Sequence, residues 1–350
     1  MANGKYANLN NEDYWIARSE ARVTQHWKNE KNVEKRLVKE YQTVASDIKN
    51  EIAEFYTRYA VDNGLTYADA IKAMSGSDLQ EYRLAIESAK ARIRLAYPDS
   101  PILADLDRLM ASNNLTRLQG KVNQIEARLL EMGVSEQLTI EESLYGTYED
   151  NYYQAIYEVQ NGVGIGMSFN KLNEQAIKTA ITMPWSGDMF SDIIWDNKRL
   201  LVKQLRQTIT NGLIRGEGYQ KMARNLNGVM DSGYKNALRI VRTETAHVVA
   251  ESTGKAYDES GLVSQYIIIA TLDNRTSSKC QKIDTKVFQL SERQLGVNYP
   301  PLHPNCRTTV AVWFDDDTIE EVTRIARGTD GKNYKVQGMN YEQWHAKYVN

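Results

Sequence analysis

A long stretch without glycine or proline constrains the fold of this chain more than any other feature. It runs from Glu12 to Asp62. Apolar residues recur along it at steps of four, four and three, which gives about 3.67 residues per turn and suits a nearly straight α-helix. A lone helix with so narrow an apolar stripe is not stable in water. We therefore expect the stripe to pack on the helices that follow, with a partner surface in an assembly as the alternative. The stripe consists of Val33, Leu37, Tyr41, Val44, Ile48, Ile52, Phe55 and Tyr59.

Charge and composition argue against several classes of protein. The 350 residues carry a formal net charge of −2, so no overall basic field attracts nucleic acid. A local basic stretch, Lys198-Arg199 with Lys203 and Arg206, remains a candidate for DNA binding. Two cysteines are too few for a disulfide scaffold. The amino terminus lacks the pattern of a signal peptide, and no apolar run reaches the length of about 18 residues that spans a membrane. We expect a soluble protein, made in a cytoplasm, with no membrane partner.

Capping residues predict further helices after the long one. Thr116 is expected to open a helix that stops near Gly133, and a capping-box pattern at Thr139 is expected to open the next. Ser232 is expected to cap a helix over residues 234–259. Other helices are expected over 77–96 and 193–214.

The composition changes after Gly261, where β-branched and apolar runs predict strands over 266–271, 287–290 and 308–313. The expected fold class is therefore α+β and mainly helical, with long N-terminal helices followed by a small C-terminal sheet-plus-helix module. A glycine-rich hinge over 162–166 marks one boundary. We expect a helical region over 1–161, a helical connector over 162–232, an α+β module over 233–315 and a polar C-terminal tail over 316–350.

Both cysteines and two of the four histidines, His247 and His303, lie within this module. His303 and Cys306 are three positions apart, a spacing at which one tight loop offers two ligands to a tetrahedral zinc ion. Cys280 and His247 are candidates for the second pair, with Asp273 as an oxygen alternative. A structural zinc would supply folding energy to a small sheet with long loops. The alternatives are two packed cysteines beside a hydrogen-bonded histidine, and a catalytic metal.

Four charged residues suggest a second constellation. Arg242 and Glu244 are two apart on a predicted helix, so they face different sides and each needs another partner. Asp273 and Arg275 follow the first predicted strand directly, as a turn does. We expect these four residues to form a buried network that fastens the loops to the helix, with an acid–base pair as the alternative. No catalytic residues are assigned.

The order of several short motifs resembles the phage minor head proteins of the Mu F type, and most closely the head morphogenesis proteins of siphophages of Gram-positive hosts. The resemblance covers residues from about 180 to 315 well. It departs from the family at Thr285, where members often have glycine, and at Thr308, where many have a second cysteine. The motifs are Arg242-Thr243-Glu244, Asp273-x-Arg275-Thr276, Cys280, Asp284, Val287-Phe288, Pro300 through Arg307, Met183 through Gly187, Phe190-Ser191-Asp192 and Ile194-Trp195.

The resemblance implies a minor capsid protein that binds the portal inside the procapsid and supports head assembly or DNA delivery. It places the protein in the virion, inside the capsid near the portal, and in the host cytoplasm during assembly. Scaffold protein, major capsid protein and packaged DNA are further partners that it suggests. Residues 1–161 would then form the assembly and portal-interaction region, and 233–315 the Mu F-like module. Trp185 and Trp195 would be anchors for a partner, with core packing as their alternative role.

Two other functions stay open on the sequence. Proteins with related modules carry toxin-like activities, so a phage-delivered enzyme such as an ADP-ribosyltransferase is one alternative. Arg242 and Glu244 would have to face one nicotinamide pocket, which their positions on a single helix disfavour. An internal DNA-binding head protein is the other alternative.

Overall fold

The computed structural model describes residues 11–60, 65–163, 169–314, 323–327 and 333–337, with Gln343 and Ala346. The chain divides into two compact units. The sheet unit comprises Met1–Asn32, Glu141–Met189 and Arg239–Asn350, and the helical unit comprises Val33–Ile140 and Phe190–Leu238. Each unit is thus assembled from segments far apart in the sequence, whereas the sequence analysis divided the chain into consecutive segments. That four-segment division stays a prediction, and residues 164–166 of the expected hinge lie outside the described residues.

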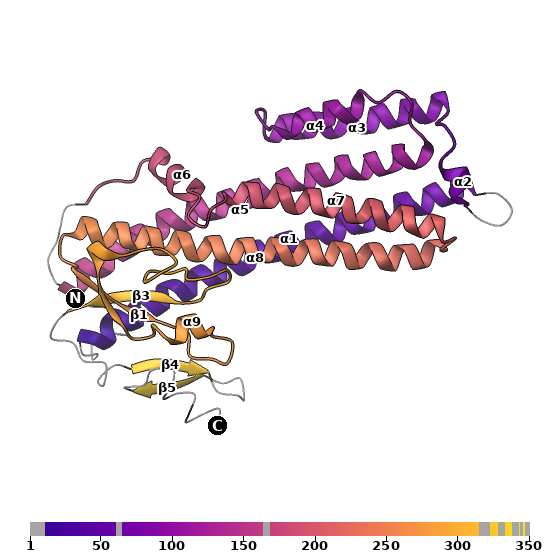
Figure 1. Ribbon diagram of the computed structural model, residues 1–350. Helices are drawn as coiled ribbons and strands as arrows, with labels where there is room; N and C mark the ends of the chain where they lie inside the picture. The colour runs from indigo at the N-terminus through magenta and orange to yellow at the C-terminus, as the bar shows by residue number, and fades with distance from the viewer. Residues whose placement is uncertain are drawn as a thin grey trace. The chain divides into compact units, whose positions relative to one another are not determined.

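The order of elements confirms a mainly helical α+β fold with the strands near the C-terminal end (Figure 1). The helices are α1 (Asn11–Tyr59), α2 (Tyr67–Ala70), α3 (Gly76–Ala96), α4 (Ile102–Met110), α5 (Arg117–Val163), α6 (Glu174–Thr182), α7 (Phe190–Ile214), α8 (Tyr219–Ser260), α9 (Ser278–Gln281) and the short 3-10 helix η1 (Leu290–Glu292). The strands are β1 (Gln265–Ile269), β2 (Val287–Gln289), β3 (Thr309–Trp313), β4 (Thr323–Arg327) and β5 (Asn333–Gln337).

Helix α1 confirms the prediction from the glycine-free and proline-free stretch. Of the apolar stripe, Val44 and Tyr59 are half-buried and the other members are buried. The ring of Tyr41 packs edge-to-face on Tyr234 of α8, 5.9 Å between ring centroids. Because the stripe is buried within a single chain, it packs on the chain's own helices, as the sequence favoured.

Helix α5 is one continuous helix, so the expected stop near Gly133 and the expected new start at Thr139 were wrong. Gly133 does not end the helix; it allows the side chain of Trp195 to pack closely against the backbone of α5. A Cβ atom at this position would lie 2.6 Å from the indole of Trp195 on α7. Glycine in a helix costs roughly 1 kcal/mol relative to alanine, and packing of the large ring offsets that cost.

Helix α8 likewise runs without a break through Ser232, which is therefore not an N-cap as expected. The neighbouring Gly233 lies against Leu201 of α7 and Tyr41 of α1, where an added Cβ atom would come within 3.1–3.2 Å of their side chains. Ser232 and Gly233 suggest a helix boundary in the sequence. In the structure, Gly233 instead lies where three helices of the helical unit pack closely.

Several charges of the basic stretch on α7 are paired with acidic residues, which disfavours it as a DNA-binding face. Lys198 is buried, and its Nζ atom lies 2.5 Å from both the carboxylate of Glu136 and the hydroxyl of Tyr41. Burial raises the pKa of Tyr41 well above its usual value. Arg206 and Arg199 form ion pairs with Glu126 and Asp196, at 3.1 Å and 3.0 Å.

The three expected strands form one antiparallel sheet in the order β2-β1-β3, with β1 in the centre. Figure 1 shows β1 beside β3. Tyr266 of β1 pairs with Phe288 of β2 and with Val312 of β3. Tyr266, Val312, Tyr299 and Tyr257 share one buried cluster. A buried central strand explains the run of isoleucines at 267–269, which the sequence analysis took as a strand.

A second pair of strands, β4 and β5, lies in the segment that was expected to be a polar tail. The sequence analysis missed these strands because both are short and rich in polar residues. Among the described residues, no helix is long and apolar enough to cross a membrane.

Candidate metal centre

Cys280, His303 and Cys306 lie together in the sheet unit. Their ligand atoms are all within 4.8 Å of one another, and the described residues hold no other such group of three or more histidine, cysteine or acidic side chains. The Sγ atoms are 3.7 Å apart, and the Cys280 Sγ atom lies 3.1 Å from His303 Nε2. Both cysteines are buried and His303 is half-buried. A disulfide requires about 2.05 Å between the sulfurs, so both residues are free thiols.

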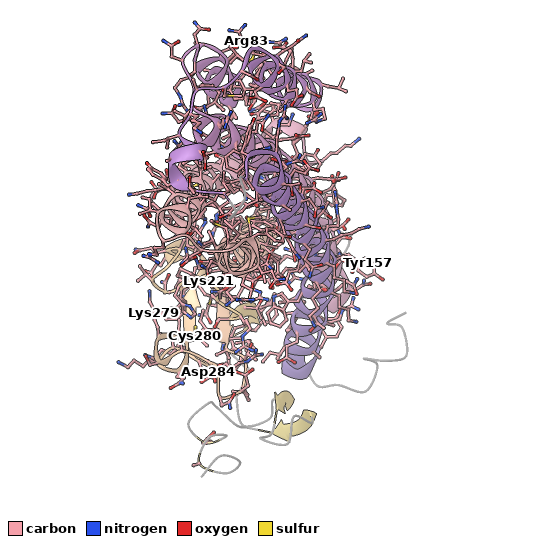
Figure 2. All side chains as sticks on the ribbon, turned by 90° about the vertical axis from the view of Figure 1, so that its right-hand side faces the viewer. Arg83, Tyr157, Lys221, Lys279, Cys280 and Asp284 are labelled. Atoms are coloured by element: carbon pink, nitrogen blue, oxygen red, sulfur yellow. The ribbon has the colours of Figure 1, made fainter. Side chains whose placement is uncertain are left out.

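Local structure brings these residues together from different elements. Helix α9 presents Cys280, and the hydroxyl of its N-cap Ser277 accepts a hydrogen bond from the Cys280 amide. Lys279 on the same helix donates to the carbonyls of Gly296 and Leu302 and so holds the loop that carries His303. Figure 2 labels Lys279 and Cys280 in the same part of the molecule, near Asp284.

The loop before β3 is a tight turn that places His303 and Cys306 on one side. The Cys306 amide donates to the His303 carbonyl at 3.1 Å. Asn305 between them has a φ of 60°, in the left-handed region that asparagine tolerates well. Its amide donates to Thr243 of α8 at 3.0 Å, so the turn is fastened to that helix.

Hydrogen bonds fix the histidine tautomer. The carbonyl of Pro304 can only accept, so the 2.8 Å contact to His303 Nδ1 requires a proton on Nδ1. The Nε2 atom therefore carries the lone pair and faces the sulfur of Cys280 and, at 2.7 Å, the hydroxyl of Ser277. An Nδ1–H bonded to a carbonyl is the usual arrangement behind a metal-binding Nε2.

The two thiols differ strongly in acidity. The hydrogen bond from Cys280 lowers the pKa of Cys306 to about 5, against the opposing effect of burial, with help from the backbone of Leu302 and the backbone and hydroxyl of Thr308. The same sulfur–sulfur contact, together with burial, raises the pKa of Cys280. The contact therefore favours the thiolate form at Cys306 over Cys280, and thiolate is the form that binds metals.

Asp273, the oxygen alternative, is occupied by another partner. Its carboxylate forms a bidentate ion pair with Arg307 at 2.6 and 2.7 Å, and accepts the amide of Arg275 at 2.9 Å. Burial opposes ionisation, but the hydrogen bonds and charge of Arg307 outweigh it and lower the pKa of Asp273. The guanidinium of Arg275 is 3.7 Å from Asp273 and 70% exposed. Arg307, which was not in the expected network of four, is therefore the main partner of Asp273.

His247 is not part of the cysteine–histidine group. It is fully buried on α8, and its ring stacks on Trp185, with centroids 5.0 Å apart. Burial lowers the pKa of His247 to about 3, and neither ring nitrogen has a hydrogen-bond partner among the described residues. Glu244, one turn away, lies 3.8 Å from His247 Nδ1 and accepts the indole N–H of Trp185 at 3.1 Å. Burial raises the pKa of Glu244 to about 7.

The expected network of four charged residues is thus separated. Arg242 lies 3.9 Å from Glu30 of α1, Glu244 belongs with Trp185 and His247, and Asp273 belongs with Arg307. Of the two expected anchors, Trp185 is half-buried. Trp195 is buried in the helical unit, and its N–H donates to Gln137 at 3.0 Å. Trp195 therefore has a core role in this conformation.

Sequence reasoning missed a buried polar cluster near the start of α1. The Arg22 guanidinium donates to Asn151 and Thr253, both at 2.7 Å, and forms an ion pair with Glu158 at 3.0 Å. It also missed Ser277 and Thr308 beside the cysteines. Ser277 stands three positions before Cys280, which is an N-cap spacing and a signal that could have found it.

Comparisons with known proteins agree with the resemblance. Residues 203–311 match the family described as Phage Mu protein F like protein. The chain is 24% identical over 324 residues to the minor head protein GP7 of Bacillus phage SPP1, which covers 89% of this chain and 91% of that protein. It is also 24% identical over 283 residues to the NAD(+)–arginine ADP-ribosyltransferase EFV of Enterococcus faecalis. That match covers 77% of this chain but only 56% of the relative's length. No solved structure matches.

Proposed function

We propose that this chain, which matches the Phage Mu protein F like family over residues 203–311 and is similar to the minor head protein of phage SPP1, binds the portal protein inside the procapsid and supports head assembly or DNA delivery. One observation carries the proposal. The match to the SPP1 minor head protein extends over 91% of that protein, so nearly the whole of a head protein corresponds to this chain. The proposed location is the inside of the capsid near the portal, reached from the host cytoplasm during assembly. Scaffold and major capsid proteins are further proposed contacts.

The surface that we assign to the portal is the outer face of α3. Leu84 and Leu95 are 64% and 87% exposed, and their separation of 11 positions puts them on the same side of the helix. The opposite side of α3 is buried in the core of the helical unit, so the exposed leucines are not needed for folding. A cavity of about 340 Å³ adjoins this face. It is lined by Gly76, Leu79, Gln80, Arg83, Leu84, Glu87 and Met110.

A helical segment of the portal is the occupant that we propose for this face. Helix-in-groove contacts use apolar anchors on one face of a helix, and Leu84 and Leu95 lie on one side of α3. The test is co-purification of the full chain with the portal encoded beside it, over a range of salt concentrations. Retention at high salt is expected because the contact is apolar, and absence of co-purification at every salt concentration would contradict the proposal.

ADP-ribosyl transfer is the second candidate, and the similarity to the Enterococcus enzyme favours it. The match covers only 56% of that relative's length, so much of the enzyme has no counterpart in the comparison. In this chain Glu244 is buried and bound to Trp185, and Arg242 lies near Glu30. The test is NAD consumption by the purified wild-type chain, with Glu244→Gln as the matched variant. Consumption that Glu244→Gln abolishes would favour the enzyme, and no consumption would favour the structural role.

A further inference from the structure

We propose that Cys280, His303 and Cys306 bind one zinc ion through their two sulfurs and His303 Nε2, with a water molecule as the fourth ligand. Two thiolates and an imidazole suit zinc, which favours nitrogen and sulfur ligands in a tetrahedral arrangement. The group is compact, buried on the cysteine side and formed by residues from two different segments. The proposal is independent of portal binding.

The spacing of the ligand atoms fits such an ion. Zinc–sulfur bonds of about 2.3 Å at tetrahedral angles place two sulfurs about 3.8 Å apart. The Cys280 and Cys306 Sγ atoms are 3.7 Å apart. The 3.1 Å contact between Cys280 Sγ and His303 Nε2 needs only a small opening to admit the metal. The sulfurs are thus held at the separation of metal ligands and not at that of a disulfide.

The surroundings orient each ligand for a cation. The Pro304 carbonyl holds the proton on His303 Nδ1, which leaves a lone pair on Nε2. A metal ion would take that lone pair from the hydrogen bond with the Ser277 hydroxyl. The hydroxyl of Thr308 hydrogen-bonds to both sulfurs, and the backbone of Leu302 and Thr308 adds further hydrogen bonds to Cys306. Hydrogen bonds to thiolates and to the outer nitrogen of a histidine are the second shell that metal sites share.

The place of the group in the fold gives the ion a structural role. The apolar cluster around the cysteines contains only Ala270, Cys280, Leu302 and Cys306 among its buried members. So small a cluster stabilises the loops weakly, and a metal that joins α9 to the turn before β3 would add folding free energy. Thr309, the first residue of β3, follows Cys306 by three positions, so the ion would also fix the start of that strand.

The first test is the zinc content of the untagged full chain, purified without chelator. About one zinc per chain is expected, with loss of the metal in His303→Gln and in Cys306→Ser. His247→Phe is the matched control, because Phe keeps the stacking on Trp185 and the His247 nitrogens make no hydrogen bonds. This variant is expected to keep its zinc. Zinc retained in both ligand variants would mean an adventitious ion only, and would overturn the proposal.

Replacement of zinc by Co²⁺ makes the test independent of variants that fail to fold. The wild type is expected to show the strong visible absorption of tetrahedral Co²⁺ and a thiolate charge-transfer band. Thr308→Cys adds a sulfur where the hydroxyl already contacts both ligands. It should strengthen the charge-transfer band and tighten metal binding at least tenfold. A chain without metal and without a Co²⁺ spectrum, or one isolated with a Cys280–Cys306 disulfide, would overturn the proposal.

Discussion

The indole of Trp185 stacks on the imidazole of His247, with ring centroids 5.0 Å apart and ring planes 15° from parallel. The same indole donates its N–H to Glu244, so one side chain covers an acid and a base that are both buried. Because burial disfavours charge on either group, it raises the pKa of Glu244 to about 7 and lowers that of His247 to about 3. The two groups should therefore affect stability in opposite directions as the pH changes.

For Glu244, folding favours the protonated carboxyl. Its contribution to stability is fully present below the unfolded value of 4.5 and is lost as the pH rises through about 7. For His247, folding favours the neutral ring, so its contribution is present above 6.5 and is lost as the pH falls toward about 3. The full contributions are on the order of 3 kcal/mol for Glu244 and 5 kcal/mol for His247.

Urea unfolding from pH 4 to pH 8 separates the two groups. Glu244→Gln should remove the loss of stability that accompanies rising pH, and His247→Phe should reduce the loss that accompanies falling pH. An ion pair between a charged Glu244 and a charged His247 would give the opposite slopes in both variants, and would contradict this account of the pair.

A side chain larger than hydrogen at Gly133 should disturb the packing of α5 against Trp195. Gly133→Ala should destabilise the chain by about 1–3 kcal/mol, because the new methyl group overlaps the Trp195 ring. The matched control is Gly146→Ala on the same helix, where an added Cβ atom meets nothing within 4 Å. That variant should be stabilised by about 0.5–1 kcal/mol. Equal effects of the two substitutions in chemical unfolding would show that Gly133 has no packing role.

The backbone at Thr285 is strained, and a glycine at this position should relieve the strain. This residue has a φ of 63°, which is unfavourable for a β-branched side chain, and it stands where the resemblance expects glycine. Thr285→Gly should raise the free energy of unfolding by about 1 kcal/mol. Thr285→Ala keeps a Cβ atom and loses the hydroxyl bond to the Asp284 carbonyl, so it should give no gain. Thermal unfolding of the three proteins under one condition compares them, and a less stable glycine variant would contradict the assignment of strain.

The outer face of α3 predicts where the portal binds. Leu84→Glu and Leu95→Glu together should lower retention on immobilised portal at least tenfold, because two charges would enter an apolar contact. Leu200→Glu on α7 changes another exposed leucine of the helical unit, 46% exposed, and should leave retention unchanged. Circular dichroism of each variant checks that the helices persist. Equal loss in all variants would remove this face from the proposal.

Patterns of neighbouring residues predicted the helices and strands that those residues themselves determine. The spacing of Leu37, Ile48 and Ile52 predicted α1, and the isoleucine run predicted the central strand, because one face or both faces of each had to be buried. The spacing of His303 and Cys306 predicted their shared site. Other features depend on tertiary contacts that no local pattern contains. Gly133 was taken for a helix end because its partner Trp195 is distant in the sequence. The pair of Asp273 with Arg307, 34 positions away, was not predicted for the same reason.

The most direct test of the account uses phage particles assembled with and without the portal. Quantitative mass spectrometry of purified procapsids would measure the copies of this chain in each. We expect the chain at a few copies per particle when the portal is present and its absence from particles made without portal protein. The same copy number in both preparations would contradict recruitment by the portal, which is the central claim.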